Sequence, residues 1–347
     1  MGNTDHKTTS LKGVFILLLT AFIWGTSFVA QSLGMEKIEA FTFNGIRTVM
    51  GGLFLLPIII IREMYYRRKT GMSNDAIPGK ASGTDIAQSK DKNAGTSNNN
   101  KVTTGNTKCT DNPANRQNIF TKKALRYGIV LGLVFFVASN FQQFAFYYST
   151  AGKIAFITSL YMFFVPIIGL FIRKRVPLLT WICVVCGFIG TFFLCIKPGQ
   201  SFEINRGDFL ALLCAFFYAI HILCVEKFSR EVDGTLLSCL QFFVGGGISI
   251  IMMFIFETPV ITDILAAGKP LLYSGIMSCG IAYTFQIIGQ QYTEATIASL
   301  LMCMESVFAV LSSAIVLNEF LTGREIIGCV IMFIAIIISQ ISTAKNK

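Results

Sequence analysis

The sequence predicts an all-α integral membrane protein of ten transmembrane helices, arranged as two five-helix inverted-topology repeats. Three observations support this prediction: an apolar composition, long apolar runs and an internal repetition of the sequence. The chain has 347 residues, of which 53% are hydrophobic and 14% charged. A soluble domain of ordinary composition has about a quarter of its residues charged. The composition therefore excludes an ordinary soluble domain.

Long apolar runs recur along the whole chain. Each holds roughly 18 to 22 residues, which is long enough to cross a bilayer as a helix. Only helices satisfy their own backbone hydrogen bonds in lipid, so a helical bundle follows. The first run is too long for a cleaved signal peptide and contains Trp24 and Gln31. The predicted spans are 13–33, 40–61, 127–147, 152–172, 179–196, 207–225, 235–256, 270–291, 296–316 and 322–342.

The second half of the chain repeats the first. Gly51-Gly52 returns 194 residues later as Gly245-Gly246, and other short stretches match at the same offset. Further along, Phe141-Gln142 returns as Phe285-Gln286 at an offset of 144. The difference between the two offsets indicates an insertion of about 50 residues in the first copy only. We therefore predict a first repeat over 12–196, interrupted by a loop at 63–125, and a second repeat over 205–343.

The distribution of basic residues predicts the orientation. Most of the 29 lysine and arginine residues fall on the side that both termini share. Cytoplasmic loops carry this excess, so we expect a multi-pass protein of the cytoplasmic membrane with both termini in the cytoplasm. Because each half has an odd number of spans, the second half enters the membrane from the opposite side. Inverted repeats of this kind are typical of secondary transporters.

The predicted loop at 63–125 has a composition of its own. Between 70 and 120 it is rich in Ser, Thr, Asn, Gly and Lys and has almost no apolar residues. Such a segment cannot bury enough surface to fold, so we predict a disordered, basic cytoplasmic loop. It is either a solvated spacer that sets the topology or an electrostatic contact with anionic membrane lipid or a cytoplasmic partner. Because this loop holds most of the net charge of +10, the charge gives no reason to expect a nucleic-acid partner.

Several short motifs resemble one known family. Trp24-Gly25-Thr26-Ser27-Phe28 resembles the W-G-x-x-F signature of the EamA-like branch of the drug/metabolite transporter superfamily. Ser306 and Arg175 depart from the proline and glutamate usual at those positions. The resemblance implies a solute exporter or metabolite carrier of the cytoplasmic membrane. It extends to Arg47 in the second span, Phe156–Tyr161 with Val165-Pro166 in the fourth, and Met304–Ala309 with Leu317-Asn318-Glu319 near the ninth.

Ionisable residues inside predicted spans are candidate functional groups. A charge at mid-membrane costs about 2.5–3.5 kcal/mol on insertion scales, so such residues need a reason to be there. Arg47, within one turn of Asn44, either binds substrate or bridges helices. Glu305 is either a proton-coupling carboxylate or a permanent counter-ion to Arg47 or another donor. His221 is a further proton-coupling candidate or a hydrogen-bonded packing residue.

Polar and aromatic residues of other spans complete the candidate site. Helical spacing puts Ser139 and Gln143 on one face, and Tyr283 and Gln286 on another. The amides of Gln143 and Gln286 serve either helix packing or substrate binding. Substrate is expected near the bilayer midplane, between the two halves. The candidate substrate-binding residues are Trp24, Asn44, Arg47, Gln143, Tyr161, Tyr283 and Glu305.

Sequence signatures of enzymes are missing from the chain. It has no H-E-x-x-H motif and no glycine-rich phosphate loop, and its two histidines are His6 and His221. We expect no catalytic residues, no cofactor, no metal and no ATPase subunit, and a monomer or homodimer that carries a small-molecule substrate. Cys183 and Cys186 lie in an apolar run, where packing is expected of them. Two alternatives stay open: a membrane-embedded lipid-modifying enzyme, and a scaffold or receptor that signals through the 63–125 loop.

Overall fold

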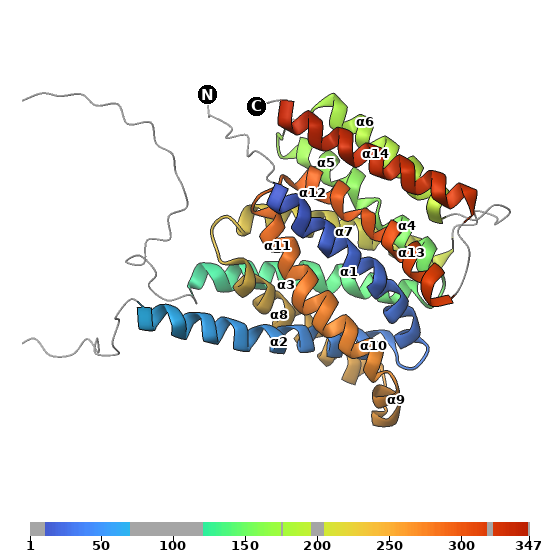
Figure 1. The fold of residues 1–347 in the computed structure, drawn as a ribbon. Coiled ribbons are helices and arrows are strands. Elements are labelled where there is room, and N and C mark those ends of the chain that lie inside the picture. The colour runs from blue at the N-terminus through green and yellow to red at the C-terminus, as the bar shows by residue number, and fades with distance from the viewer. Residues whose placement is uncertain (1–10, 70–120, 175, 196–204, 318–321, 346–347) are drawn as a thin grey trace, which may run out of the picture. The chain divides into compact units, whose positions relative to one another are not determined.

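A computed structural model describes residues 11–69, 121–174, 176–195, 205–317 and 322–345. Within these ranges the protein is helical and has no strand (Figure 1). The chain divides into two compact units, one of residues 1–59 and 119–347 and the other of 60–118. The described part of the second unit is the C-terminal end of one helix, at 60–69. The helical bundle described below belongs to the first unit.

Helical segments lie in all ten predicted ranges. The first half contains α1 (Leu11–Met35), α2 (Ala40–Lys69), α3 (Lys122–Ala145), α4 (Ala151–Thr158), α5 (Tyr161–Phe171) and α6 (Leu178–Cys195). The second half begins with α7 (Arg206–Phe228), α8 (Gly234–Phe256) and the short α9 (Ile261–Ala266). It continues with α10 (Gly268–Leu272), the π-helix η2 (Tyr273–Tyr283), α11 (Thr284–Gln290), α12 (Ala295–Met302), α13 (Met304–Leu317) and α14 (Gly323–Lys345).

The described helices have the length and surface of membrane spans. Eight helical segments are long and apolar enough to cross a bilayer, and a shorter apolar helix lies at Leu178–Phe193. Large apolar side chains cover the outside of the bundle, among them Phe15, Phe254 and Ile251. An exposed apolar surface of this extent suits contact with lipid. The protein is therefore a multi-pass membrane protein, and the number of ten crossings stays a prediction.

The predicted loop at 63–125 is too long at both ends. The structure continues α2 as far as Lys69 and begins α3 at Lys122. Residues 62–69 are rich in arginine, glutamate and lysine, which favour helix even where no apolar run continues. Thr121 caps α3, because its Oγ1 accepts a hydrogen bond of 3.1 Å from the Ala124 N–H. The predicted disorder concerns 70–120, which lie outside the described residues.

Two of the expected spans are broken in the middle, at matching places. The segments α4 and α12 each hold eight residues and begin 144 residues apart. The helix resumes at Tyr161 after α4 and at Met304 after α12. At the breaks, the Ser159 and Ser306 hydroxyls also bond backbone carbonyls one turn back, at 2.7 Å. Such local side-chain bonds compete with the regular helical ladder.

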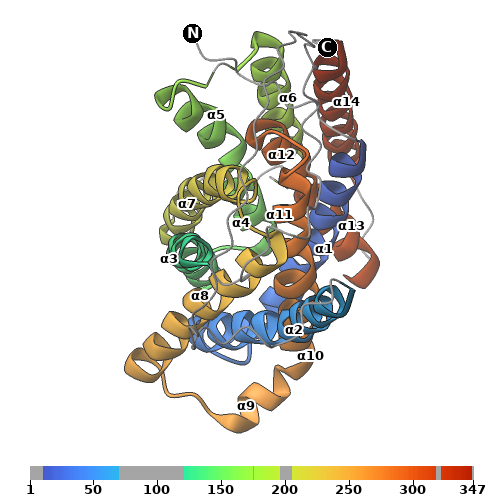
Figure 2. The same ribbon diagram turned by 90° about the vertical axis from the view of Figure 1, so that its left-hand side faces the viewer.

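The two broken helices meet at their breaks. Ser159 Oγ lies 3.2 Å from Ser306 Oγ, and the Cys303 thiol lies 3.6 Å from the Ser159 carbonyl oxygen. Ser159, Cys303 and Ser306 are fully buried, so the breaks lie inside the bundle. Elsewhere α3 packs on α7 and α8, α1 packs on α11 and α13, and α6 packs on α14. Both views show α6 and α14 side by side at one end of the bundle (Figures 1 and 2).

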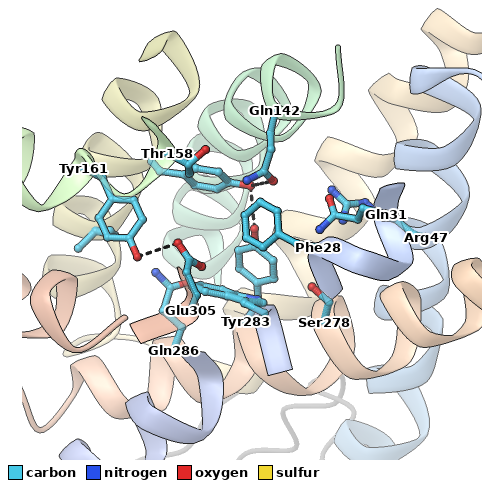
Figure 3. A pocket seen from close by; sticks show the side chains of 13 residues that line it. Phe28, Gln31, Arg47, Gln142, Thr158, Tyr161, Ser278, Tyr283, Gln286 and Glu305 are labelled. Atoms are coloured by element: carbon cyan, nitrogen blue, oxygen red, sulfur yellow. Dashed lines mark hydrogen bonds between the residues drawn. The ribbon is translucent and has the colours of Figure 1, made fainter. Parts of the chain in front are cut away.

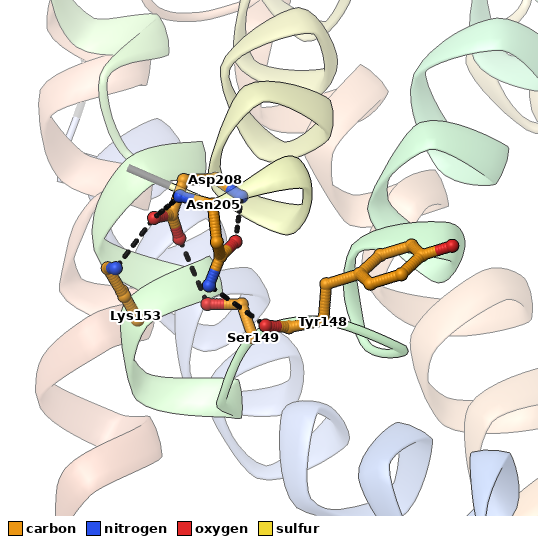
Figure 4. A network of polar contacts seen from close by, with 5 residues as sticks. All are labelled: Tyr148, Ser149, Lys153, Asn205 and Asp208. Carbon is orange, nitrogen blue, oxygen red and sulfur yellow. Dashed lines mark hydrogen bonds and ion pairs between the residues drawn. The ribbon is translucent and has the colours of Figure 1, made fainter. Parts of the chain in front are cut away.

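Polar contacts also join helix ends. Glu257 follows α8, and its carboxylate accepts hydrogen bonds of 2.7 Å from the N–H groups of Phe41 and Thr42. These N–H groups open α2 and have no partner within the helix, so an acid is stabilising there. Near the start of α7, the buried Asp208 accepts from Lys153 at 2.6 Å and from Ser149 at 3.0 Å (Figure 4). This network ties α7 to the start of α4.

Candidate functional site

A pocket lies inside the bundle and encloses about 430 Å³ of empty space, part of it open to the surroundings. Small-molecule sites commonly have mainly apolar walls and a few polar groups. The walls come from both halves of the chain (Figure 3). The pocket is lined by Trp24, Phe28, Gln31, Arg47, Gln142, Thr158, Tyr161, Tyr218, Ile222, Ser278, Tyr283, Gln286 and Glu305.

Close helix packing positions one wall. Trp24, Phe28 and Gln31 recur along α1 at helical spacing and so share one face. Gly25 lets α1 approach the start of α13, because a Cβ there would stand 2.6 Å from the Glu305 carbonyl oxygen. In the same way, a Cβ on Gly275 would stand 3.1 Å from the Arg47 carbonyl oxygen. The glycines therefore bring Trp24 near Glu305, and Arg47 near the π-helix η2.

The π-helix η2 supplies two lining residues, Ser278 and Tyr283. A π-helical turn widens the helix and turns side chains away from their α-helical directions, and such turns are frequent at functional sites. Sequence periodicity at 3.6 residues per turn therefore assigns the wrong faces to this stretch. Gln286 follows on α11, where it also lines the pocket.

Aromatic side chains form the middle of the pocket. The Tyr218 and Tyr283 hydroxyls lie 2.8 Å apart, and the Trp24 and Tyr283 rings have centroids 4.7 Å apart. Tyr218 also donates a hydrogen bond of 3.5 Å to Gln142 Oε1. These rings offer a solute apolar contact area with a few fixed polar points.

Two charged residues line the pocket without pairing with each other. Glu305 is 4% exposed and accepts a hydrogen bond of 3.1 Å from the Tyr161 hydroxyl. Arg47 is 2% exposed, donates from Nε to Asn44 Oδ1 at 3.0 Å, and lies 5.6 Å from the Phe43 ring centre. Within the described residues Arg47 has no carboxylate within 4.0 Å. In Figure 3 the two residues lie on opposite sides of the labelled group.

Five predicted site residues therefore meet at one pocket: Trp24, Arg47, Tyr161, Tyr283 and Glu305. Asn44, Gln143 and His221 do not line it. Asn44 holds Arg47 and donates to Ser139 at 3.0 Å. His221 Nε2 lies 2.8 Å from Gln241 Oε1. Gln143 is fully buried, and neither atom of its amide has a hydrogen-bond partner.

Eight lining residues were not among the predicted site residues, and the sequence repeat contains a signal for several of them. Four pairs of lining residues are related by the two repeat offsets. They are Trp24 with Tyr218, Phe28 with Ile222, Gln142 with Gln286, and Tyr161 with Glu305. A candidate binding residue in one repeat therefore predicts a candidate at the equivalent position of the other repeat. The remaining missed residues, Gln31, Thr158 and Ser278, carry no such signal.

The described residues offer no evident metal centre. Among them, no group of three or more His, Cys, Asp or Glu side chains is arranged to hold a metal ion. Cys183 and Cys186 lie on α6, the first buried and the second partly buried. The pocket therefore offers hydrogen bonds, two charges and aromatic surface.

These features define a class, a multi-pass membrane protein with an internal pocket, and the sequence comparisons assign it to a family of transporters. The sequence model of the EamA-like transporter family matches residues 11–73 and 205–340. The chain belongs to the EamA-like transporter family. Two relatives that match over most of the chain are named as uncharacterized transporters.

An uncharacterized transporter of Archaeoglobus fulgidus is 26% identical over 327 residues, which cover 93% of this chain and 83% of the relative. The uncharacterized transporter YoaV of Bacillus subtilis is 19% identical, with 95% of this chain and 97% of the relative covered. Protein PecM of Dickeya dadantii is 26% identical over 228 residues, 64% of this chain and 73% of the relative. A solved crystal structure superposes with a TM-score of 0.68 at 15% identity, covering 96% of this chain and 98% of the other. The last similarity concerns the fold alone.

Proposed function

We propose that this protein is a secondary transporter, an exporter or metabolite carrier, that moves a small organic solute across the cytoplasmic membrane by alternating access. The solute binds in the pocket described above, between the two halves of the chain. Both termini lie in the cytoplasm, and the protein works as a monomer or homodimer without an ATPase subunit. The observation that carries the proposal is the pocket itself, which is built from matched positions of two repeats.

The matched positions support an inverted repeat. Eight of the pocket's lining residues form four pairs at offsets of 194 and 144 residues. The broken helices are related by the same offset, since α4 and α12 have equal length and begin 144 residues apart. In transporters with inverted repeats, one half rocks against the other around a site at their interface. A pocket walled by residues at equivalent positions suits that motion, because both halves contribute matching parts of its wall.

The charges of the pocket favour a solute with a carboxylate. Arg47 has no carboxylate partner among the described residues, so its guanidinium is available to a ligand. Guanidinium and carboxylate match each other in geometry and charge. The aromatic walls add apolar contact area. Glu305, on the far side, is the proposed proton-coupling group.

Transport in proteoliposomes tests this proposal. Comparing metabolites inside and outside cells, with and without the protein, identifies the solute. We then expect Trp24→Phe, Arg47→Gln and Tyr161→Phe each to lower the rate or affinity of its transport. Trp181→Phe on α6, away from the pocket, is the matched control and should transport normally. If the three pocket variants insert normally and transport at the wild-type rate and affinity, the site lies elsewhere.

A further inference from the structure

One matched pair of polar residues in the pocket is bonded, whereas its counterpart is not. Tyr218 and Gln142 form the first pair, and the Tyr218 hydroxyl donates to Gln142 Oε1 at 3.5 Å. The repeat offsets map Tyr218 onto Trp24 and Gln142 onto Gln286. The counterpart of the bond would thus join the Trp24 indole N–H to the Gln286 amide oxygen. Instead, Trp24 Nε1 and Gln286 Oε1 are both buried without a hydrogen-bond partner.

These two atoms are a complementary donor and acceptor on residues that line the same pocket. Gln286 is 1% exposed and lies one turn after Tyr283, whose ring packs against Trp24 at 4.7 Å. In Figure 3 the Gln286 side chain extends from its helix beside Glu305. An indole N–H donates only, whereas an amide oxygen accepts. Buried polar atoms are nearly always paired, so an unpaired donor and acceptor beside a ligand pocket call for a ligand group.

We propose that Gln286 is a specificity-determining residue, whose amide oxygen acts with the Trp24 indole N–H to select solutes that carry a hydroxyl group. This inference rests on the proposed function, since it names a group of the solute that the same pocket binds. A hydroxyl donates to the Gln286 oxygen and accepts from the Trp24 N–H at the same time. The carboxylate of the solute meets Arg47, and the hydroxyl lies further along the aromatic wall.

The expected ratio of affinities depends on the cost of binding a solute that lacks the hydroxyl. A solute without this group excludes water from the two atoms and leaves a buried donor and acceptor unpaired. A site built to bond a hydroxyl rejects the analogue that lacks it more strongly than an apolar pocket rejects an extra group. We expect at least about a tenfold preference for the hydroxylated solute.

The fluorescence of Trp24 can be used to measure binding in the pocket. The chain has two tryptophans, Trp24 and Trp181, so a Trp181→Phe protein reports on Trp24 alone. The probes are 3-(4-hydroxyphenyl)propionate and 3-phenylpropionate, two aromatic carboxylates that differ by one hydroxyl at the end of the ring far from the carboxylate. Each is titrated into the purified full-length protein in detergent while Trp24 emission is recorded, with excitation where the phenol does not absorb. We expect 3-(4-hydroxyphenyl)propionate to bind about tenfold more tightly.

Variants at the two matched glutamines decide the assignment. Gln286→Met keeps the length of the side chain but removes the acceptor, and should bring the ratio of the two affinities to within twofold of one. Gln142→Met is the matched control. This substitution can change the affinity for each probe. The ratio of the two affinities should stay near tenfold, because the Gln142 oxygen is already bonded to Tyr218. If Gln286→Met does not fold, Gln286→Asn withdraws the acceptor by one carbon and should give the same loss.

The outcomes separate this inference from the proposed function. If the preference for the hydroxylated probe persists in Gln286→Met, Gln286 does not determine it. The role of Gln286 is also overturned if Gln142→Met loses the preference to the same extent. Equal binding of the two probes by the Trp181→Phe protein overturns it as well, while leaving a carboxylate site intact. If neither probe binds the folded protein, the carboxylate site of the proposed function is itself contradicted, and the selectivity falls with it.

Discussion

Tyr161 and Glu305 are related by the same offset of 144 residues that relates α4 to α12, and the Tyr161 hydroxyl donates to Glu305 Oε1 at 3.1 Å. Each residue lies just after the break in its helix. The two broken helices thus meet through matched positions at the pocket wall. If Glu305 takes up the coupling proton, as proposed, its protonation acts on this contact between the two halves.

We expect Glu305→Gln to abolish solute accumulation driven by a pH gradient but to retain solute exchange. Glutamine keeps the shape and an acceptor for the Tyr161 hydroxyl, yet it cannot take up or release a proton. Accumulation and exchange of the identified solute are measured in proteoliposomes with and without a pH gradient. Trp181→Phe, away from the pocket, is the control and should accumulate solute normally, whereas Tyr161→Phe should be slower but still respond to the pH gradient. Normal pH-driven accumulation by the Glu305→Gln protein would show that Glu305 carries no coupling proton.

The separation of Arg47 and Glu305 predicts independent effects on stability. The described residues show no ion pair between them, so neither replacement leaves the other as a newly unpaired charge. The free energies of unfolding of Arg47→Gln, Glu305→Gln and the double variant are measured by titration with sodium dodecyl sulfate. We expect the two losses to add within about 0.5 kcal/mol. A double variant clearly more stable than the sum predicts would reveal a direct pair.

The close packing at Gly25 predicts a strong effect of one methyl group. A Cβ there would stand 2.6 Å from both the Glu305 carbonyl oxygen and Phe308 Cβ. We expect Gly25→Ala to lower the free energy of unfolding by about 1–3 kcal/mol, as overpacking does. Gly247→Ala is the matched control, since a Cβ at Gly247 meets nothing within 4 Å. In that helix alanine should be neutral or stabilising by up to about 1 kcal/mol. Equal losses at both glycines would refute the close approach of α1 and α13.

The network around Asp208 predicts that two ion pairs of similar length differ in strength. Lys153 and Asp208 lie 2.6 Å apart with side chains 17% and 5% exposed, whereas Lys123 and Glu231 are 54% and 36% exposed at the same distance. Lys153→Met should cost about 1–3 kcal/mol, because it leaves a buried carboxylate with fewer donors. Lys123→Met should cost much less, because that ion pair is exposed to solvent. Chemical unfolding measures both, and a smaller loss at Lys153 than at Lys123 would contradict the network.

The sequence predicts the helices better than it predicts which way they face. Apolar length and the repeated glycine pairs are enough to place the helical segments. The rotation of each helix, however, depends on its neighbours. Gln142 and Gln143 are adjacent, about 100° apart around α3. Packing against α7 and α8 turns Gln142 to the pocket and buries Gln143 away from it. Hydropathy does not separate these two amides.

The helix breaks were missed for a related reason. Ser159 and Cys303 are compatible with a membrane helix, so composition alone predicts continuous spans at 152–172 and 296–316. The breaks depend on side-chain bonds to backbone carbonyls and on the contact between the two helices. The missed lining residue Tyr218 was within reach of the sequence, because the repeat offset of 194 leads to it from the predicted Trp24. Phe28 and Ile222 are also related by this offset, but neither was a predicted site residue.

Alternating access at the pocket is tested most directly by a cysteine introduced at Ser278, which lines the pocket on η2. Ser278→Cys is made in a protein whose ten native cysteines are replaced, and a membrane-impermeant thiol reagent is applied to either face of sealed vesicles. Ser249→Cys, at a buried position bonded by Asn140 at 3.0 Å, is the control and should stay unlabelled. We predict that the thiol of the Ser278→Cys protein is labelled from each face in turn, and that transported solute slows both reactions. Labelling from one face only, whatever the solute gradient, would contradict alternating access at this pocket.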